Sequence, residues 1–146
     1  MRIALAADHA AVREKDALAR LLREWGHEVL DFGTHGEASV DYPDHARPAA
    51  EAVGRGEADR GILLCGSGVG QCMVANKVPR VRAVLAANPF VAEMSRRHND
   101  ANVACFGARW QDPATIQALA KLWLETPYEG GRHAARVAKI EAGEGR

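Results

Sequence analysis

The sequence lacks several features that would place it in other classes of protein. No hydrophobic run approaches the roughly 20 residues that a membrane-spanning helix needs, so we expect no membrane partner. Only three cysteines occur in 146 residues, and their odd number and spacing fit neither a disulfide framework nor a zinc site. Nineteen basic residues balance nineteen acidic ones, and this zero net charge gives no electrostatic reason to expect nucleic acid as a partner.

What the sequence does contain is typical of one folded domain. Apolar residues make up 47% and charged residues 26%, which excludes a disordered chain. The length predicts a single domain over residues 1–146, with a polar, frayed tail at 141–146. The first apolar run meets Asp8 and His9 too early for a signal peptide, which together with the few cysteines favours a reduced, cytoplasmic protein.

Short apolar runs alternate with longer segments of helical periodicity, a pattern typical of βαβ units around a parallel sheet. The predicted strands are 3–7, 27–32, 61–65, 81–86 and 102–107, and the predicted helices are 11–25, 43–54, a short one ending near 77, 88–98, 113–124 and 130–142. With right-handed crossovers they predict a Rossmann-like α/β fold, a three-layer αβα, doubly wound, five-stranded parallel sheet with a C-terminal helix. Ligands of such sheets bind beyond the carboxyl ends of the strands.

The most informative segment follows the third predicted strand and consists of Cys65, Gly66, Ser67, Gly68, Val69 and Gly70. Alternate glycines let backbone N–H groups approach a ligand closely, and the next helix adds its positive end, so this loop could hold an oxyanion or a phosphate. It matches neither the dinucleotide fingerprint nor a Walker motif. A tight strand-to-helix turn would explain the same glycines.

A cysteine and an acid–imidazole pair, all with catalytic potential, lie at the same edge of the predicted sheet. A thiol at Cys65 could serve as a nucleophile or a base. The alternative is a buried cysteine that acts as a small hydrophobic residue, as we expect for Cys72 and Cys105. Asp8 and His9 follow the first strand, where they could bind a polar ligand or simply cap a turn.

Three arginines are candidates for binding a phosphate. Arg132 and Arg136 are four residues apart, so a helix would place both guanidinium groups on one face. Arg109 follows the fifth predicted strand, at the edge where ligands bind. Together they could clamp a phosphate through charge-assisted hydrogen bonds, although an arginine of this kind taken singly is more often a solvated surface charge.

His98 and Asn99 end a predicted helix and precede the fifth strand, so they belong to the opposite, amino edge of the sheet. A strand of five residues is roughly 17 Å long, which separates His98 from the loop after Cys65 in its own subunit. Either His98 is a helix C-terminal histidine stabilised by the helix dipole, or it completes the site of a neighbouring subunit. The second alternative predicts a dimer. His27, His45 and His133 are expected to be surface or structural residues.

Taken together, these fragments resemble the type B ribose-5-phosphate isomerases and the related galactose-6-phosphate isomerase subunits. The resemblance rests on an ordered set of segments that runs from residue 3 to about residue 140, and no single segment is decisive. The segments are 6–9 (AADH), 41–43 (DYP), 61–70 (GILLCGSGVG), 75–77 (ANK), 82–83 (RA), 97–102 (RHNDAN), 106–109 (FGAR) and 128–133 (YEGGRH).

The resemblance implies an aldose–ketose isomerase that works through an enediolate, without a metal or a cofactor. It implies that Cys65 is the base, because the branch with a glutamate base would need that residue where this chain has Gln71. The implied partner for the enediolate oxygens is the loop 66–70, with the Ser67 hydroxyl. The other implied roles are ring opening by His98, hydroxyl binding by Asp8 and Asn99, and phosphate binding by His9, Arg109, Arg132 and Arg136.

The resemblance also implies a homodimer with shared active sites, and association to a tetramer stays open. Three functions compete: an isomerase of ribose 5-phosphate, an isomerase of the same class acting on an allose, galactose or tetrose phosphate, and a non-catalytic sugar-phosphate-binding protein. Residues 10–13 depart from the pattern of many relatives, and the loop 34–42 could also border the pocket. Both features leave the choice of sugar open.

Overall fold

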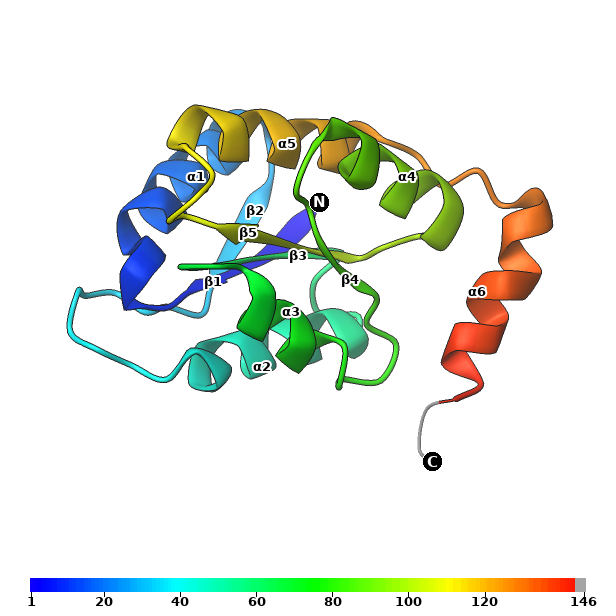
Figure 1. Cartoon of the computed structure of the whole chain (residues 1–146), viewed down its shortest axis with the longest axis horizontal. Helices are drawn as coiled ribbons and strands as arrows, with labels where there is room; N and C mark the ends of the chain where they lie inside the picture. The colour runs from blue at the N-terminus through cyan, green and yellow to red at the C-terminus, as the bar shows by residue number, and fades with distance from the viewer. Residues whose placement is uncertain (144–146) are drawn as a thin grey trace.

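The structure is a computed structural model that describes residues 1–143, and it shows a five-stranded parallel sheet between two layers of helices (Figure 1). The strand order is β2-β1-β3-β5-β4, the doubly wound arrangement that was predicted. The strands are β1 (Arg2–Ala7), β2 (Glu28–Asp31), β3 (Arg60–Cys65), β4 (Ala83–Leu85) and β5 (Val103–Gly107). The helices are η1 (His9–Ala11), α1 (Val12–Glu24), α2 (Tyr42–Gly54), α3 (Val69–Ala75), α4 (Pro89–Asn99), α5 (Pro113–Glu125), η2 (Gly131–His133) and α6 (Ala134–Glu141).

The structure corrects three of the predicted boundaries. Strand β4 is half the predicted length, because the Arg82 backbone N–H donates to the Asn102 side chain and not to a neighbouring strand. Helix α3 ends at Ala75, before the expected position near 77. The last predicted helix is divided into η2 and α6, which follow the positive φ angles of Gly130 and Gly131. Of the predicted frayed tail 141–146, Glu141 belongs instead to α6, 142–143 form a turn, and 144–146 lie outside the described residues.

The two faces of the sheet are packed with side chains of different size. On the face covered by α1 and α5, Ile3 and Leu5 of β1 are completely buried. On the other face β1 presents Ala4 and Ala6, and α2 adds buried alanines, so that helix lies close to the sheet. Cys105 is buried on this face, as predicted. Cys72 was also predicted to be a core residue, but it is only half-buried.

An ion pair with one buried partner joins α1 to β2 beneath the carboxyl edge of the sheet. The Lys15 ammonium is completely buried and donates to Asp31 at 2.6 Å. Burial alone would raise the pKa of Asp31, but the hydrogen bonds from Lys15 and from the Gly33 N–H outweigh it and lower that pKa below its ordinary value. The pair therefore stabilises the end of β2 when Asp31 is ionised.

Helix α6 differs from the other helices because it stands beside the sandwich and not on it (Figure 1). It has no buried residue, and Ile140 on it is 49% exposed. Its C-terminal end is tied to the body by an ion pair between Glu141 and Arg82. A helix with this little packing is poorly stabilised by its own chain. Within residues 1–143, no helix combines the length and apolar content needed to cross a membrane.

Candidate active site

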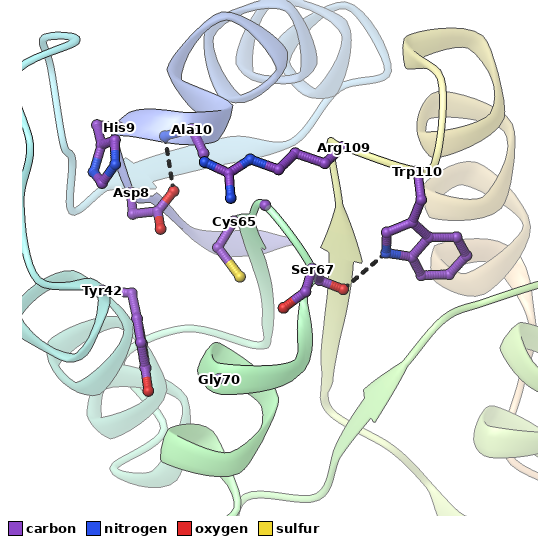
Figure 2. Close-up of a pocket in the computed structure, with 10 residues that line it drawn as sticks. Asp8, His9, Ala10, Tyr42, Cys65, Ser67, Gly70, Arg109 and Trp110 are labelled. Atoms are coloured by element: carbon purple, nitrogen blue, oxygen red, sulfur yellow. Dashed lines mark hydrogen bonds between the residues drawn. The ribbon is translucent and has the colours of Figure 1, made fainter.

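A polar cleft of about 320 Å³ lies at the carboxyl edge of the sheet, where ligands of this fold class bind (Figure 2). We call it the carboxyl-edge cleft. Its lining comes from the loops that follow β1, β3 and β5 and from the start of α2, and consists of Asp8, His9, Ala10, Tyr42, Cys65, Gly66, Ser67, Gly70, Arg109 and Trp110. The volume lies within the range of small-molecule sites.

Cys65 is the last residue of β3, and its sulfur is held at the floor of the cleft. The thiol is free, its residue is only 3% exposed, and Sγ accepts a hydrogen bond from the Gly68 N–H at 3.0 Å. The same N–H would stabilise negative charge on the sulfur through a charge-assisted hydrogen bond. Cys65 therefore lines the cleft with a sulfur whose position is fixed by the loop that follows it.

The loop after Cys65 is compact because Gly68 adopts a left-handed conformation, with φ of +79°. A Cβ at Gly68 would lie 2.8 Å from the backbone carbonyl carbon of Phe106 in β5, so only glycine fits this approach to the sheet. Two of the N–H groups expected to face a ligand are already engaged: Gly68 donates to Cys65, and Val69 donates to the Ser67 hydroxyl oxygen at 3.2 Å. The Ser67 hydroxyl accepts that bond and keeps its own proton for a further acceptor.

Asp8 and His9 border the cleft next to Cys65. One carboxylate oxygen of Asp8 accepts from the Ala10 N–H at 2.9 Å, and the other points into the space between Tyr42 and Cys65 (Figure 2). Nδ1 of His9 accepts from the Val40 N–H at 3.2 Å, so the neutral ring carries its proton on Nε2. Asp8 thus caps the turn, which was one of the two alternatives, and its second carboxylate oxygen faces the cleft.

Arg109 extends over the loop after Cys65 because position 66 has no side chain. A Cβ at Gly66 would lie 3.0–3.1 Å from atoms of the Arg109 side chain. Within residues 1–143, the guanidinium makes no hydrogen bond or ion pair, so its charge is available to an anion in the cleft. The backbone is fixed by hydrogen bonds from the Arg109 N–H to the Gly66 carbonyl and from the Ala108 N–H to the Cys65 carbonyl.

The other predicted site residues lie elsewhere, and we call them the amino-edge group: His98, Asn99, Arg132 and Arg136. His98 and Asn99 end α4 before β5 begins, while Cys65 is paired with the last residue of β5, so a full strand separates them. The end of α4 is fixed by the buried Arg96, which donates to Asp100 and to the Ala101 carbonyl.

His133, which we expected to be merely surface or structural, is buried against His98. Their rings stack with centroids 4.2 Å apart and planes 15° apart. Burial, the nearby His98 and the positive charge of Arg132 lower the pKa of His133 below its ordinary value. His133 is therefore the neutral ring against which His98 stacks. Glu129 completes a cluster that resembles a cation site in composition, but stacked rings cannot both direct a lone pair at one ion.

Two cleft residues had no assigned role from the sequence. Tyr42 places its ring against Gly70, where a Cβ would lie 2.6 Å from Cζ. Trp110 donates from its indole to the Ser67 carbonyl at 2.9 Å. For Trp110 the signal available was its position directly after Arg109, and for Tyr42 it was the segment 41–43 (DYP) of the resemblance. Gln71 is buried, with its amide nitrogen donating to the Leu64 carbonyl, which is a structural contact.

The fold and the cleft define the class of the protein: an α/β protein with a small-molecule site that combines a thiol, a carboxylate and a cation. Comparison with known proteins gives the family. The model of the family described as Ribose/Galactose Isomerase matches residues 3–140. The chain belongs to this family.

Individual relatives agree with the family match. Ribose-5-phosphate isomerase B of Escherichia coli is 43% identical over 145 residues, which cover 99% of this chain and 97% of that protein. The structure of ribose-5-phosphate isomerase B of Clostridium thermocellum gives a TM-score of 0.95 at 46% identity, covering 97% of this chain and 96% of that one. A D-erythrulose-4-phosphate isomerase of Pectobacterium atrosepticum is 39% identical, covering 96% and 93%. The chain is thus a sugar-phosphate isomerase of the aldose–ketose type.

Proposed function

We propose that the protein interconverts ribose 5-phosphate and ribulose 5-phosphate, with Cys65 as the base and no cofactor. The observation that carries this proposal is the position of the Cys65 sulfur, held by the Gly68 N–H in a cleft shared with Asp8 and Arg109. The relatives named ribose-5-phosphate isomerase B support the choice of sugar.

The reaction transfers one proton between neighbouring carbons. The Cys65 thiolate removes the proton from C2 of the open-chain aldose, and the C2 electron pair forms the C1–C2 double bond while the carbonyl oxygen becomes the enediolate oxygen. The thiol then returns the proton to C1 to give the ketose, while a proton passes between the two substrate oxygens. The Ser67 hydroxyl, which accepts from Val69 and has its proton free, would donate to the developing negative charge.

The remaining cleft residues hold the substrate. The free carboxylate oxygen of Asp8 accepts hydrogen bonds from sugar hydroxyls. Arg109 and the Nε2–H of His9 bind the phosphate, since both are donors and Arg109 has no partner of its own in the described part of the chain. Substrate is thereby fixed at both ends, which keeps C1 and C2 next to the sulfur.

The amino-edge group belongs to the proposal as the contribution of a second subunit. His98 would open the furanose ring by donating a proton, Asn99 would bind a hydroxyl, and Arg132 and Arg136 would complete the phosphate site. All four lie far from the cleft of their own chain, and both arginines are exposed. A homodimer that places this group over the partner's cleft would use both sets of residues.

Exposed apolar side chains support the dimer. Met73 is 64% exposed and Phe90 is 71% exposed. Met73 and Val69 line an apolar hollow of about 390 Å³ beside the carboxyl-edge cleft, and Ile140 is exposed on α6. Exposed apolar groups of this size favour burial in an interface. A cytoplasmic location also belongs to the proposal, because all three cysteines are free, as a reducing compartment keeps them.

A second candidate is the same chemistry on a shorter sugar, because a D-erythrulose-4-phosphate isomerase is 39% identical over nearly the whole chain. The test is an isomerase assay with chelator on ribose 5-phosphate, allose 6-phosphate, galactose 6-phosphate and erythrose 4-phosphate. We expect kcat/KM for ribose 5-phosphate of at least about 10⁴ M⁻¹s⁻¹ and much lower values for the others. Turnover of only another sugar phosphate would replace the substrate, and no turnover of any would favour a binding protein.

A further inference from the structure

One peptide group connects Trp110 to the sulfur of Cys65 (Figure 2). Its carbonyl, that of Ser67, accepts a hydrogen bond from the indole Nε1–H at 2.9 Å. Its N–H, that of Gly68, donates to Sγ of Cys65 at 3.0 Å. The Ser67–Gly68 bond is trans, so its C=O and N–H point in opposite directions. The indole and the thiol therefore hold the same peptide from its two sides.

The contact of Trp110 depends on a glycine in β5. A Cβ at Gly107 would lie 2.1 Å from the indole nitrogen and 2.5 Å from the Ser67 carbonyl oxygen. The side chain of Trp110 is not needed as core filling, because the residue is 52% exposed at the rim of the cleft. Its one hydrogen bond spans 43 residues of sequence and ends on the loop that carries the proposed base.

The peptide held in this way is one that would otherwise turn easily. Its rotation changes ψ of Ser67 and φ of Gly68, and the backbone angles of glycine are less restricted than those of any other residue type. Rotation of this peptide would take the N–H away from the sulfur. A hydrogen bond to the carbonyl also polarises the N–H at the other end, strengthening it by about 10–30% in condensed-phase estimates.

We infer that Trp110 is a positioning residue for Cys65, in that its indole N–H keeps the Ser67–Gly68 peptide turned so that the Gly68 N–H stabilises the thiolate. The inference rests on the proposed function for its consequence in catalysis, because the thiolate is the proposed base. The arrangement of the three groups is independent of which sugar phosphate is bound.

The test measures the thiolate directly, as the rate of Cys65 alkylation by iodoacetamide against pH. Fragment-ion mass spectrometry separates Cys65 from Cys72, which lies in the same tryptic peptide. Trp110→Phe keeps an aromatic ring and removes the N–H donor. We expect the midpoint of the pH profile to rise by about 0.5–1 unit, the effect of weakening one charge-assisted hydrogen bond. The acid limb of the kcat/KM profile is expected to move with it, with KM changed less than twofold.

Two further variants separate the donor from the ring. Trp110→His restores an N–H donor, because the imidazole Nε2 is the same number of bonds from Cβ as the indole Nε1, and we expect it to return the midpoint to the wild-type value. Trp25→Phe is the control, since Trp25 lies at the end of α1 beside Lys121, and it is expected to leave the profile unchanged.

An unchanged midpoint in Trp110→Phe, or an equal shift in Trp110→Phe and Trp110→His, would overturn the inference. Because alkylation requires no turnover, its result is independent of the isomerase assay. A shifted midpoint in a protein that does not isomerise ribose 5-phosphate would reject the proposed substrate and retain the positioning role. Normal isomerase activity with an unshifted midpoint would retain the proposed function and reject the positioning role.

Discussion

The carboxyl-edge cleft and the amino-edge group are both rich in polar side chains, but they differ in where those side chains find partners. In the cleft, Cys65, Asp8 and His9 each accept a hydrogen bond from a backbone N–H of the same chain. In the amino-edge group, Arg132 and Arg136 make no ion pair within residues 1–143.

The difference shows what one chain can and cannot complete. The loops after parallel strands converge, so one subunit can assemble a base, a carboxylate and a cation. A group at the opposite edge cannot converge on them, and α6, which carries Arg136 and follows Arg132, has no buried residue. The cleft is organised by folding, and we expect the amino-edge group to become part of a site only through assembly.

The largest expected effect comes from removing the proposed base. Cys65→Ala should lower kcat/KM about 10²–10⁴-fold, the usual contribution of general acid–base catalysis, while substrate binding measured by calorimetry is retained. Cys72→Ser is the control, because Cys72 is a second free cysteine that does not line the cleft. Retained turnover in Cys65→Ala would remove the cysteine-base mechanism.

The sharing of sites is tested by purified heterodimers made from two defective chains. One chain carries Cys65→Ala and the other His98→Ala, so a shared arrangement leaves one of the two sites intact. We expect about half of the wild-type kcat. The control heterodimer pairs a wild-type chain with one that carries both substitutions, and there a shared arrangement leaves no intact site.

No activity in the first heterodimer and about half of the wild-type kcat in the control heterodimer would place His98 and Cys65 in one subunit's site and contradict the shared arrangement. Light scattering on the wild-type protein gives the oligomeric state at the same concentrations, and a monomer would contradict it as well.

A smaller effect is expected from the exposed arginines. Arg132→Ala or Arg136→Ala should raise KM for a phosphorylated sugar about 10–100-fold, the loss of a hydrogen bond to a charged group, with little change in kcat. Lys139→Ala is the control, because Lys139 lies on α6 together with Arg136. An equal loss on an unphosphorylated sugar would show that these arginines do not bind phosphate.

The smallest effect on activity is expected from a change beneath the cleft that alters only stability. Lys15→Met leaves Asp31 without its buried partner and should lower the free energy of unfolding by about 2 kcal/mol, with kcat changed less than twofold. The control is Arg13→Met on the same helix, which removes only an exposed ion pair with Glu37 and is expected to cost at most about 0.5 kcal/mol.

The ion pair also predicts a pH dependence. Because folding lowers the pKa of Asp31, its stabilising contribution is present above the unfolded value of about 3.9 and is lost as the pH falls through the lower folded value. Urea titrations of wild type and Lys15→Met between pH 6 and pH 2 should therefore converge at the acid end. A difference that stays constant with pH would contradict this role of Asp31.

Much of the fold was predictable because its signals are local. Apolar runs of strand length at 3–7, 61–65 and 102–107 predicted β1, β3 and β5, and helical periodicity predicted their connections. The strand-end rule then predicted that Asp8, Cys65 and Arg109 would meet, and they line one cleft. Strand β4 was predicted too long because the side chain of Asn102, from a distant segment, binds the Arg82 N–H.

The sequence by itself determined the order of helices and strands, the edge where the cleft lies and several of the residues that line it, because each depends on short-range periodicity or on one general rule of topology. Only the tertiary structure decided that His133 stacks on His98 and that Trp110 holds the peptide above Cys65. Such contacts join segments tens of residues apart, and their existence depends on side-chain directions and distances that no local pattern encodes.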